Sequence, residues 1–214
     1  MRNLSILVVL FCGCFALKGK KIIFPKQTAT DHVILKPTVK EPLKQLTVCL
    51  RSYTDLTREH SLLSIATTGS GKDNTFLIYP IPPTSCSVFI NGEEVSFRVK
   101  DEGLNWKYTC VAWDSETGLV ILSINNKQYP IKGVKKGSPI GPEMSVILGQ
   151  EQDTYGGGFQ TGQSFVGEIY DVIMWDHVVF TSGYYSNPGN IFNWINGSYV
   201  IRGDTVTLNN LSEY

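Results

Sequence analysis

Short runs of β-branched, aliphatic and aromatic residues recur along the whole chain, separated by clusters of Gly, Pro, Asn and Asp. Such spacing is typical of a sandwich or jelly roll, because each run has the length of a strand and each cluster can form a turn. No stretch carries the period of a long helix. The sequence therefore predicts an all-β jelly-roll sandwich, with one short helix at Thr181 to Tyr185. The expected strands are Val33 to Leu35, Leu46 to Leu50, Phe76 to Tyr79, Ser87 to Ile90, Val95 to Val99, Tyr108 to Trp113, Leu119 to Ile124, Met144 to Leu148, Val166 to Trp175 and Ser198 to Arg202.

The N-terminal residues have the pattern of a targeting segment. Arg2 precedes an apolar run, Leu4 to Leu17, which is shorter than the roughly 20 residues that span a bilayer. A basic start, a short apolar core and a small-residue exit are typical of a cleaved secretory signal, and the alternative is a buried first strand. We expect residues 1–19 to be this signal, cleaved between positions 14 and 19. Residues 20–214 are then expected to form one extracellular domain without a transmembrane segment.

Charge and cysteine content limit the possible partners and compartments. The formal net charge is zero, so bulk electrostatics predict no nucleic-acid partner. Cys49 and Cys110 each lie inside a strand-like run, and a disulfide between two strands is the natural prediction for a secreted chain. Cys86 is left over, either as a buried free thiol or as an intermolecular link. Asn196 and Asn210 each begin an Asn-x-Ser sequon and are candidate glycosylation sites.

Two dipeptides predict tight turns. Asn125-Asn126 tolerates positive φ and predicts a hairpin, and Asn91-Gly92 favours a two-residue type I′ turn. The second turn fixes a register in which Phe89 faces Glu94, so that a ring and a carboxylate stand side by side on one face of the sheet. On position alone, an exposed cross-strand pair without function explains them equally well.

The segment from Glu151 to Gln163 combines two carboxylates and several amides with three consecutive glycines. Calcium takes six to eight oxygen ligands, including amides and backbone carbonyls, and glycine supplies the backbone conformations needed to wrap an ion. A solvated surface loop is nearly as good an explanation of this segment alone. Asp73-Asn74 is a second oxygen-rich position, which would extend the site if it faced the later loop.

Several motifs resemble the pentraxin family, and the resemblance runs from Ile23-Phe24-Pro25 to the C-terminal strand. The segment Gly149 to Asp153, the glycines after it, Ser164 to Ile169 and Met174-Trp175-Asp176 carry this likeness. Tyr108 to Ser115 resembles the family signature His-x-Cys-x-Ser/Thr-Trp-x-Ser, although Tyr108 and Ala112 depart from it. The resemblance implies a flattened, lectin-like jelly roll with one short helix, in a ring that usually has five subunits.

The same resemblance implies two calcium ions on one face of each subunit. The first would be held by Asp73, Asn74, Glu151, the carbonyl of Gln152, and Asp153, and the second by Glu151, Asp153, Gln160 and Gln163. The family usually has an acidic residue at position 160, so the neutral amide of Gln160 predicts a weaker second site.

The resemblance also implies a ligand class. Family members hold phosphocholine or phosphoethanolamine through calcium. Leu77, Tyr79 and Glu94 match the wall around the amine, and Phe89 stands in that wall where some members have a small residue and others an aromatic one. A ring at Phe89 can attract an ammonium by cation–π contact or fill the space that three methyl groups need. The second effect favours phosphoethanolamine or similar phosphomonoesters. Complement components are expected on the opposite face of the ring.

Two other functions compete with calcium-dependent binding in innate defence. A jelly-roll glycosidase needs two carboxylates aimed across a cleft, whereas the adjacent pair Glu93-Glu94 would point to opposite faces of a strand. His32, His60 and His177 have no metal-ligand spacing. The sequence therefore predicts a binding protein and not an enzyme. A pentraxin with degraded calcium sites is the third possibility, disfavoured by the acidic residues that are present.

Overall fold

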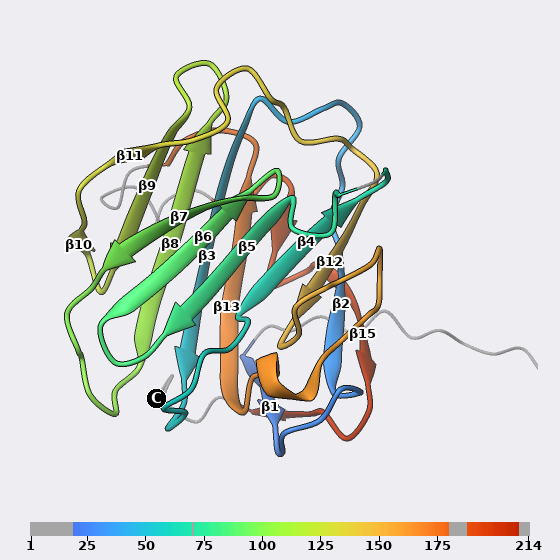
Figure 1. Ribbon diagram of the computed structural model, residues 1–214. Coiled ribbons are helices and arrows are strands. Elements are labelled where there is room, and N and C mark those ends of the chain that lie inside the picture. Colours follow the sequence, from blue (N-terminus) through green and yellow to red (C-terminus); the bar gives the residue numbers. More distant parts are fainter. Residues whose placement is uncertain (1–18, 70, 180–187, 210–214) are drawn as a thin grey trace, which may run out of the picture.

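The computed structural model describes residues 19–69, 71–179 and 188–209, and it consists of two antiparallel sheets stacked face to face (Figure 1). The larger sheet has the strand order β10-β9-β8-β3-β13-β1-β16, with β11 paired to β9 and β14 paired to β13. The smaller sheet has the order β15-β2-β12-β4-β5-β6-β7. The predicted all-β sandwich is confirmed.

The strands of the larger sheet are β1 (Lys20–Phe24), β3 (Gln45–Tyr53), β8 (Lys107–Asp114), β9 (Leu119–Ile124), β10 (Lys127–Gln128), β11 (Lys132–Gly133), β13 (Gly167–Trp175), β14 (Phe192–Asn193) and β16 (Val206–Asn209). Those of the smaller sheet are β2 (His32–Lys36), β4 (Leu63–Thr67), β5 (Phe76–Ile81), β6 (Ser85–Ile90), β7 (Glu93–Arg98), β12 (Met144–Leu148) and β15 (Ser198–Arg202). One 3-10 turn, η1 (Thr161–Gln163), follows β12. The short helix expected at Thr181 to Tyr185 lies outside the described residues.

Each predicted strand run coincides with an observed strand. Six observed strands were not predicted, namely β1, β4, β10, β11, β14 and β16, of which β10, β11 and β14 have only two residues each. All five residues of β4 are buried, but Ser64 and Thr67 interrupt its apolar residues, so the segment lacks the continuous apolar run that is typical of a strand buried on both faces. Strand β4 lies between β12 and β5 in the smaller sheet, where Ser64 pairs with Leu77 on one side and with Ile147 on the other.

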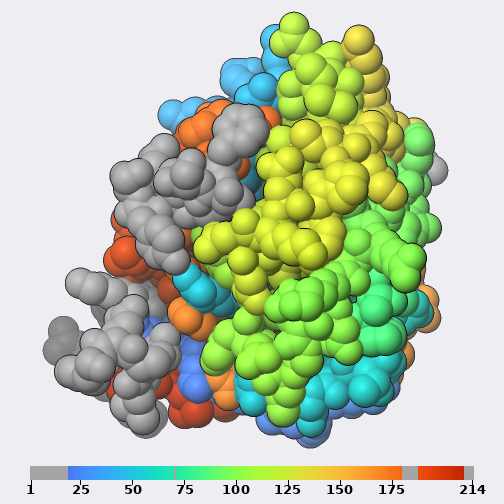
Figure 2. Space-filling model, turned by 90° about the vertical axis from the view of Figure 1, so that its left-hand side faces the viewer, coloured from blue at the N-terminus to red at the C-terminus, as the bar shows by residue number. Residues whose placement is uncertain are grey.

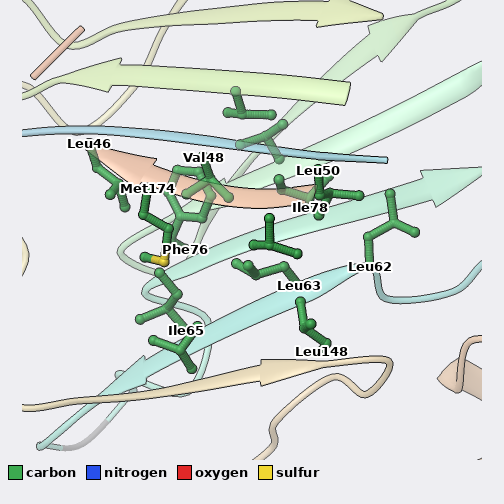
Figure 3. Packing of buried hydrophobic residues seen from close by; sticks show 14 of the residues in the cluster. Leu46, Val48, Leu50, Leu62, Leu63, Ile65, Phe76, Ile78, Leu148 and Met174 are labelled. Carbon is green, nitrogen blue, oxygen red and sulfur yellow. The ribbon is translucent and has the colours of Figure 1, made fainter. Parts of the chain in front are cut away.

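The hydrophobic core fills the space between the sheets. Val48, Leu50 and Met174 from the larger sheet point toward Ile65 and Phe76 from the smaller one (Figure 3), and all five side chains are buried. Side chains alternate between the two faces of each strand, so the neighbours of these residues project outward. The outer face of the smaller sheet thus carries Leu77, Tyr79, Ser87, Phe89 and Glu94.

Both predicted turns are present, and the one at Asn91-Gly92 has the predicted register. Asn91 and Gly92 have φ values of 47° and 78°, and Phe89 pairs with Glu94 across the β6–β7 hairpin. Asn125 and Asn126 also have positive φ, at 50° and 64°, between β9 and β10.

The disulfide between Cys49 and Cys110 is confirmed. The two cysteines are directly opposed on β3 and β8, so the bond joins neighbouring strands of one sheet and not the two sheets. Cys86 is a buried free thiol that packs in the main core, which leaves it unsuited to an intermolecular link.

Candidate metal and ligand site

The segment between β12 and β13 is fixed to the sandwich by two buried glutamines. It is the gold-to-orange ribbon that contains η1 (Figure 1). Gln150 donates through Nε2 to the carbonyls of Thr28, at 2.7 Å, and Asp31, at 3.0 Å. The main-chain carbonyl of Gln150 accepts a hydrogen bond from Ser61 Oγ at 2.9 Å. These bonds hold the start of the segment against the residues that precede β2 and against Ser61, which precedes β4.

Gln152 fixes the same segment to the outer face of the smaller sheet. Its Nε2 donates to the carbonyls of Ser64, at 3.0 Å, and Ser145, at 3.1 Å, and its Oε1 accepts from Gly156 N at 2.9 Å. The residue is fully buried. Because the side chain is committed to these bonds, only the main-chain carbonyl of Gln152 is left to serve an ion, as the sequence comparison with pentraxins predicts.

A tight glycine turn brings the two ends of the loop together. Thr154 and Gly157 exchange backbone hydrogen bonds of 3.2 and 3.0 Å, and Gly158 has a φ of +75°. A Cβ on Gly158 would lie 2.8 Å from the Cβ of Asp153, so that position requires glycine both for its backbone conformation and for space. The turn places Gln160 beside Asp153, to whose Oδ2 its Nε2 donates at 2.7 Å.

Glu151 is the buried acid at the centre of the site. It is 2% exposed, although it carries a carboxylate. The pKa of Glu151 is raised to about 7, first by burial and then by the charges of Asp153 and Asp73, while hydrogen bonds from the amides of Asn74 and Gln163 oppose the shift. These influences act at short range, so the structure brings Asp73 and Asn74 from the β4–β5 connection to the later loop.

Three oxygens of this cluster are buried without a hydrogen-bond partner. They are Asn74 Oδ1, Glu151 Oε2 and Gln163 Oε1. Buried polar atoms are normally satisfied, and carboxylate and amide oxygens are the ligands that calcium takes in proteins. The residues therefore fit a calcium ion. Among the described residues, no three His, Cys, Asp or Glu side chains form a metal-binding group by themselves, so a site here depends on the amides as well as the acids.

The segment Asp73–Thr75, which contains two of the predicted metal ligands, is joined to the β6–β7 hairpin through the backbone. Gly92 N donates to the carbonyl of Asn74, and Asn91 N donates to the carbonyl of Thr75, each at 2.8 Å. The turn of the hairpin and the Asp73-Asn74 segment are thus one connected piece of structure.

The predicted ligand wall continues from this cluster across the outer face of the sheet. Phe89 pairs with Leu77 on one side and with Glu94 on the other. Leu77 is buried, Phe89 is half-buried and Glu94 is exposed. Ser87 Oγ donates to Glu94 Oε1, which holds the carboxylate toward β5.

Tyr79 connects the wall with the cluster of acids and amides. Its pKa is raised to about 12, first by burial and then by the charge of Glu59, and it forms a side-chain hydrogen bond with Gln163. The phenol is therefore neutral at physiological pH. All four predicted wall residues lie on one face, beside the predicted donors.

The sequence analysis missed the residues that support the site. Gln150, Ser61 and Ser64 anchor the loop, and Ser87 positions Glu94. A usable signal was present, because Ser61 and Ser64 are polar residues inside an apolar run and such residues need partners when buried. Of the two candidate glycosylation sites, Asn196 is exposed and Asn210 lies outside the described residues.

Comparisons with known proteins agree on one family. The Pentaxin family model matches residues 20–209. The chain is 52% identical to jeltraxin of Lepidobatrachus laevis, over 98% of this chain and 97% of the relative. It is 48% identical to C-reactive protein of Xenopus laevis, over 97% and 91% of the two chains, and 43% identical to the serum amyloid P-component of Cavia porcellus, over 86% of each.

The solved structures show the same fold. A native heptameric SAP-like pentraxin from Limulus polyphemus matches with a TM-score of 0.80 at 24% identity, over 92% of this chain and 98% of that one. Within the described ranges, no helix has the length and apolar character needed to cross a membrane.

Proposed function

Because the chain belongs to the pentraxin family, we propose that it is a secreted pattern-recognition protein that binds phosphomonoester ligands through calcium. Phosphocholine and phosphoethanolamine are the ligand types, displayed on microbial or damaged-cell surfaces. The observation that carries the proposal is the set of unpartnered buried oxygens on Asn74, Glu151 and Gln163. Two ions with oxygen ligands would between them satisfy all three.

We propose two ions in each subunit. Asp73, Asn74, Glu151, Asp153 and the carbonyl of Gln152 would hold the first. Calcium supplies positive charge with open coordination positions, to which phosphate oxygens bind.

The second ion would be held by Glu151, Asp153, Gln160 and Gln163, and more weakly. Gln160 contributes no charge, and its amide nitrogen donates to Asp153, so the amide has to turn before its oxygen can face the site. Calcium titration by calorimetry should resolve two unequal affinities, and Gln160→Glu should bring them closer together. Two equally tight sites in the unaltered protein would contradict this assignment.

The wall of Leu77, Tyr79, Phe89 and Glu94 would select the amine of the ligand. Glu94 is exposed and held by Ser87, so its carboxylate can pair with an ammonium. The half-buried ring of Phe89 lies between Glu94 and Leu77, where the methyl groups of choline would need space. We therefore propose a preference for phosphoethanolamine over phosphocholine.

Binding to immobilised phosphocholine and phosphoethanolamine tests both parts of this proposal. The unaltered protein should bind in calcium, elute with a chelator, and be retained longer on phosphoethanolamine. Phe89→Thr should shift the preference toward phosphocholine. Leu119→Thr is the matched control, because it removes a 43% exposed leucine from β9 in the other sheet. It should change neither the calcium-dependent binding nor the preference between the two matrices. Failure to bind either matrix in calcium would refute the main proposal.

A calcium-dependent carbohydrate or other anionic-ligand function is the alternative within the family. The similarity to the serum amyloid P-component of Cavia porcellus supports it. Competition between phosphoethanolamine and anionic polysaccharides for the same resin would distinguish the two ligand classes. A jelly-roll hydrolase is the least favoured alternative, and turnover of a glycoside substrate would establish it.

The remaining parts of the proposal concern assembly and location. We propose that residues 1–19 are a secretory signal, that residues 20–214 are the extracellular domain, and that the domain forms a ring, with five subunits expected and complement components as partners. The solved relative from Limulus polyphemus is described as heptameric. Sedimentation of the secreted protein would give the number of subunits, and N-terminal sequencing would give the cleavage site.

A further inference from the structure

A cavity of about 450 Å³ opens between the two sheets at one end of the sandwich. Its walls come from the segment that follows β3, the β5–β6 turn and the β7–β8 connection. Figure 2 shows the β7–β8 connection, in green, beside the segment that follows β3, in cyan. None of the proposed calcium donors or ligand-wall residues lines this cavity, so it is a separate feature of the molecule.

The inner part of the cavity is apolar. Leu62, Cys86 and Ile124 line it and are buried, with exposed fractions of 1%, 2% and 7%. Leu56 and three prolines contribute further apolar surface. Pockets of roughly 300–1,000 Å³ with apolar walls and a few polar groups are the usual sites for small ligands, and this cavity falls within that range.

Leu104 is an exposed hydrophobic residue in the cavity lining. It lies in the β7–β8 connection, lines the cavity and is 58% exposed. A leucine in this position gains from any apolar ligand that covers it, because burial removes its side chain from water.

Lys107 places a positive charge beside the apolar interior. It is the first residue of β8 and pairs with the buried Ser52, so it projects from the inner face of the sheet, as the buried Thr109 does two residues later. Its side chain is half-buried. It also lies close to His60 in the same wall, since its charge adds to burial and to Arg58 in lowering the pKa of His60.

Lys107 and Lys100 both line the cavity, and neither forms an ion pair with a described residue. The carboxylates in the lining are Asp55, Asp101 and Glu102. Asp55 and Asp101 are exposed to water, and Asp101 already accepts a hydrogen bond from Gly103 N at 2.8 Å. Glu102 is half-buried, as Lys107 is. The pairing of Lys107 with Ser52 places the lysine on the inner face of the sheet, so an anion inside the cavity can pair with its ammonium.

We propose that this cavity binds a medium-chain alkyl carboxylate, with the chain between the sheets and the carboxylate paired with Lys107. A volume of about 450 Å³ holds about fifteen atoms of the size of water, at roughly 30 Å³ each. A carboxylate of about ten to twelve carbons has, with its two oxygens, about twelve to fourteen such atoms and nearly fills it. The site needs no calcium, so its failure and the failure of the proposed function are distinguishable.

A chain-length series in EDTA tests the proposal. Calorimetry of the intact protein with carboxylates of six to fourteen carbons, below their micelle concentrations, should show saturable binding. The affinity should rise about fourfold for each added methylene, as expected for complete burial, and stop rising near ten to twelve carbons, when the cavity is full. Absence of saturable binding, or an affinity that still rises at fourteen carbons, would overturn the proposal, since a surface that binds any amphiphile has no length limit.

A substitution of Lys107, measured with a charged and an uncharged ligand, tests the role of this residue. Lys107→Met keeps most of the apolar stem and should weaken decanoate binding about tenfold, the typical loss for a bond to a charged group, while decanol binding stays the same. Lys127→Met, at an exposed lysine of β10, is the matched control. Equal loss for decanoate and decanol, or no loss for either, would refute the pairing with Lys107.

A second variant tests the apolar lining without touching the charge. Leu104→Thr should weaken decanoate and decanol alike, whereas Leu119→Thr on β9 should weaken neither. Calcium-dependent retention on phosphoethanolamine should be unchanged in every variant, which also reports that each one has folded. Vesicles of long-chain anionic phospholipid form the last arm, and binding to them with the same dependence on Lys107 would overturn the assignment to a free medium-chain acid.

Discussion

Replacing Glu151 with Gln should change the stability of the protein in opposite directions with and without calcium. Without the ion, Glu151 is a buried carboxylate near two other acids. Glutamine has nearly the same shape and carries no charge. In EDTA at pH 8, we therefore expect Glu151→Gln to be more stable than the unaltered protein.

The size of the effect follows from the pKa. The folded value is about 7, compared with the ordinary 4.5, a difference of about 2.5 units. At 1.36 kcal/mol per unit, this amounts to about 3 kcal/mol. The folded state binds more protons than the unfolded state between these two values, so the stability of the unaltered protein falls as pH rises from 4.5 through 7. The gain in Glu151→Gln is thus absent near pH 4 and complete at pH 8.

Thermal unfolding followed by circular dichroism, at fixed protein concentration, measures this effect. A gain of about 3 kcal/mol raises Tm by roughly 6–12 °C for a chain of this length. Glu116→Gln removes an exposed carboxylate and should leave Tm unchanged. In saturating calcium the unaltered protein should be the more stable of the two. Bound calcium stabilises the folded state, and the variant lacks one of the proposed calcium ligands.

Two results would contradict this reasoning. The first is a Tm of the unaltered protein that does not change between pH 5 and pH 8 in EDTA. The second is a loss of stability in Glu151→Gln at pH 8 in EDTA, which would mean that the carboxylate is satisfied without an ion.

Three further predictions test the scaffold of the site. Gly158→Ala should cost about 1 kcal/mol or more through its positive φ and, by displacing Asp153, weaken calcium binding measured by calorimetry. Replacing Cys49 and Cys110 with Ala should lower the free energy of unfolding by about 4 kcal/mol, from the chain-entropy model for a 61-residue separation. The loss should appear as a lower midpoint of urea unfolding. Gln152→Ala should lower the free energy of unfolding by about 2–3 kcal/mol, because it leaves buried backbone carbonyls without donors, and unchanged urea unfolding would show that the loop is not anchored there.

The features that short-range chemistry determines were predictable from the sequence. The pairing of Phe89 with Glu94 followed from the Asn91-Gly92 dipeptide, because a two-residue turn leaves only one register. The disulfide followed from the presence of Cys49 and Cys110 in strand-like runs. Short runs of β-branched, aliphatic and aromatic residues between turn-forming clusters identified most of the longer strands.

Features that depend on long-range packing were not predictable in the same way. The spacing of Asn74 and Gln163 along the chain contains no sign that both lie against Glu151, and only the family resemblance suggested it. The anchoring role of Gln150 depends on the carbonyl of Thr28, which no local pattern marks. The cavity beside Lys107 results from three separate connections, so its volume could not be inferred from any one of them.

The backbone bonds from the β6–β7 turn to Asn74 and Thr75 have a consequence for how such a protein can diverge. The placement of Asp73 and Asn74 depends on main-chain atoms of the turn, whereas the ligand choice that we propose depends on side chains such as Phe89. Substitutions in the wall are therefore free to accumulate without disturbing the metal donors. A change at Gly92, in contrast, alters both properties together. If the proposed roles hold, a chain with this turn can change its ligand by substitutions in the wall while the proposed calcium donors stay in place.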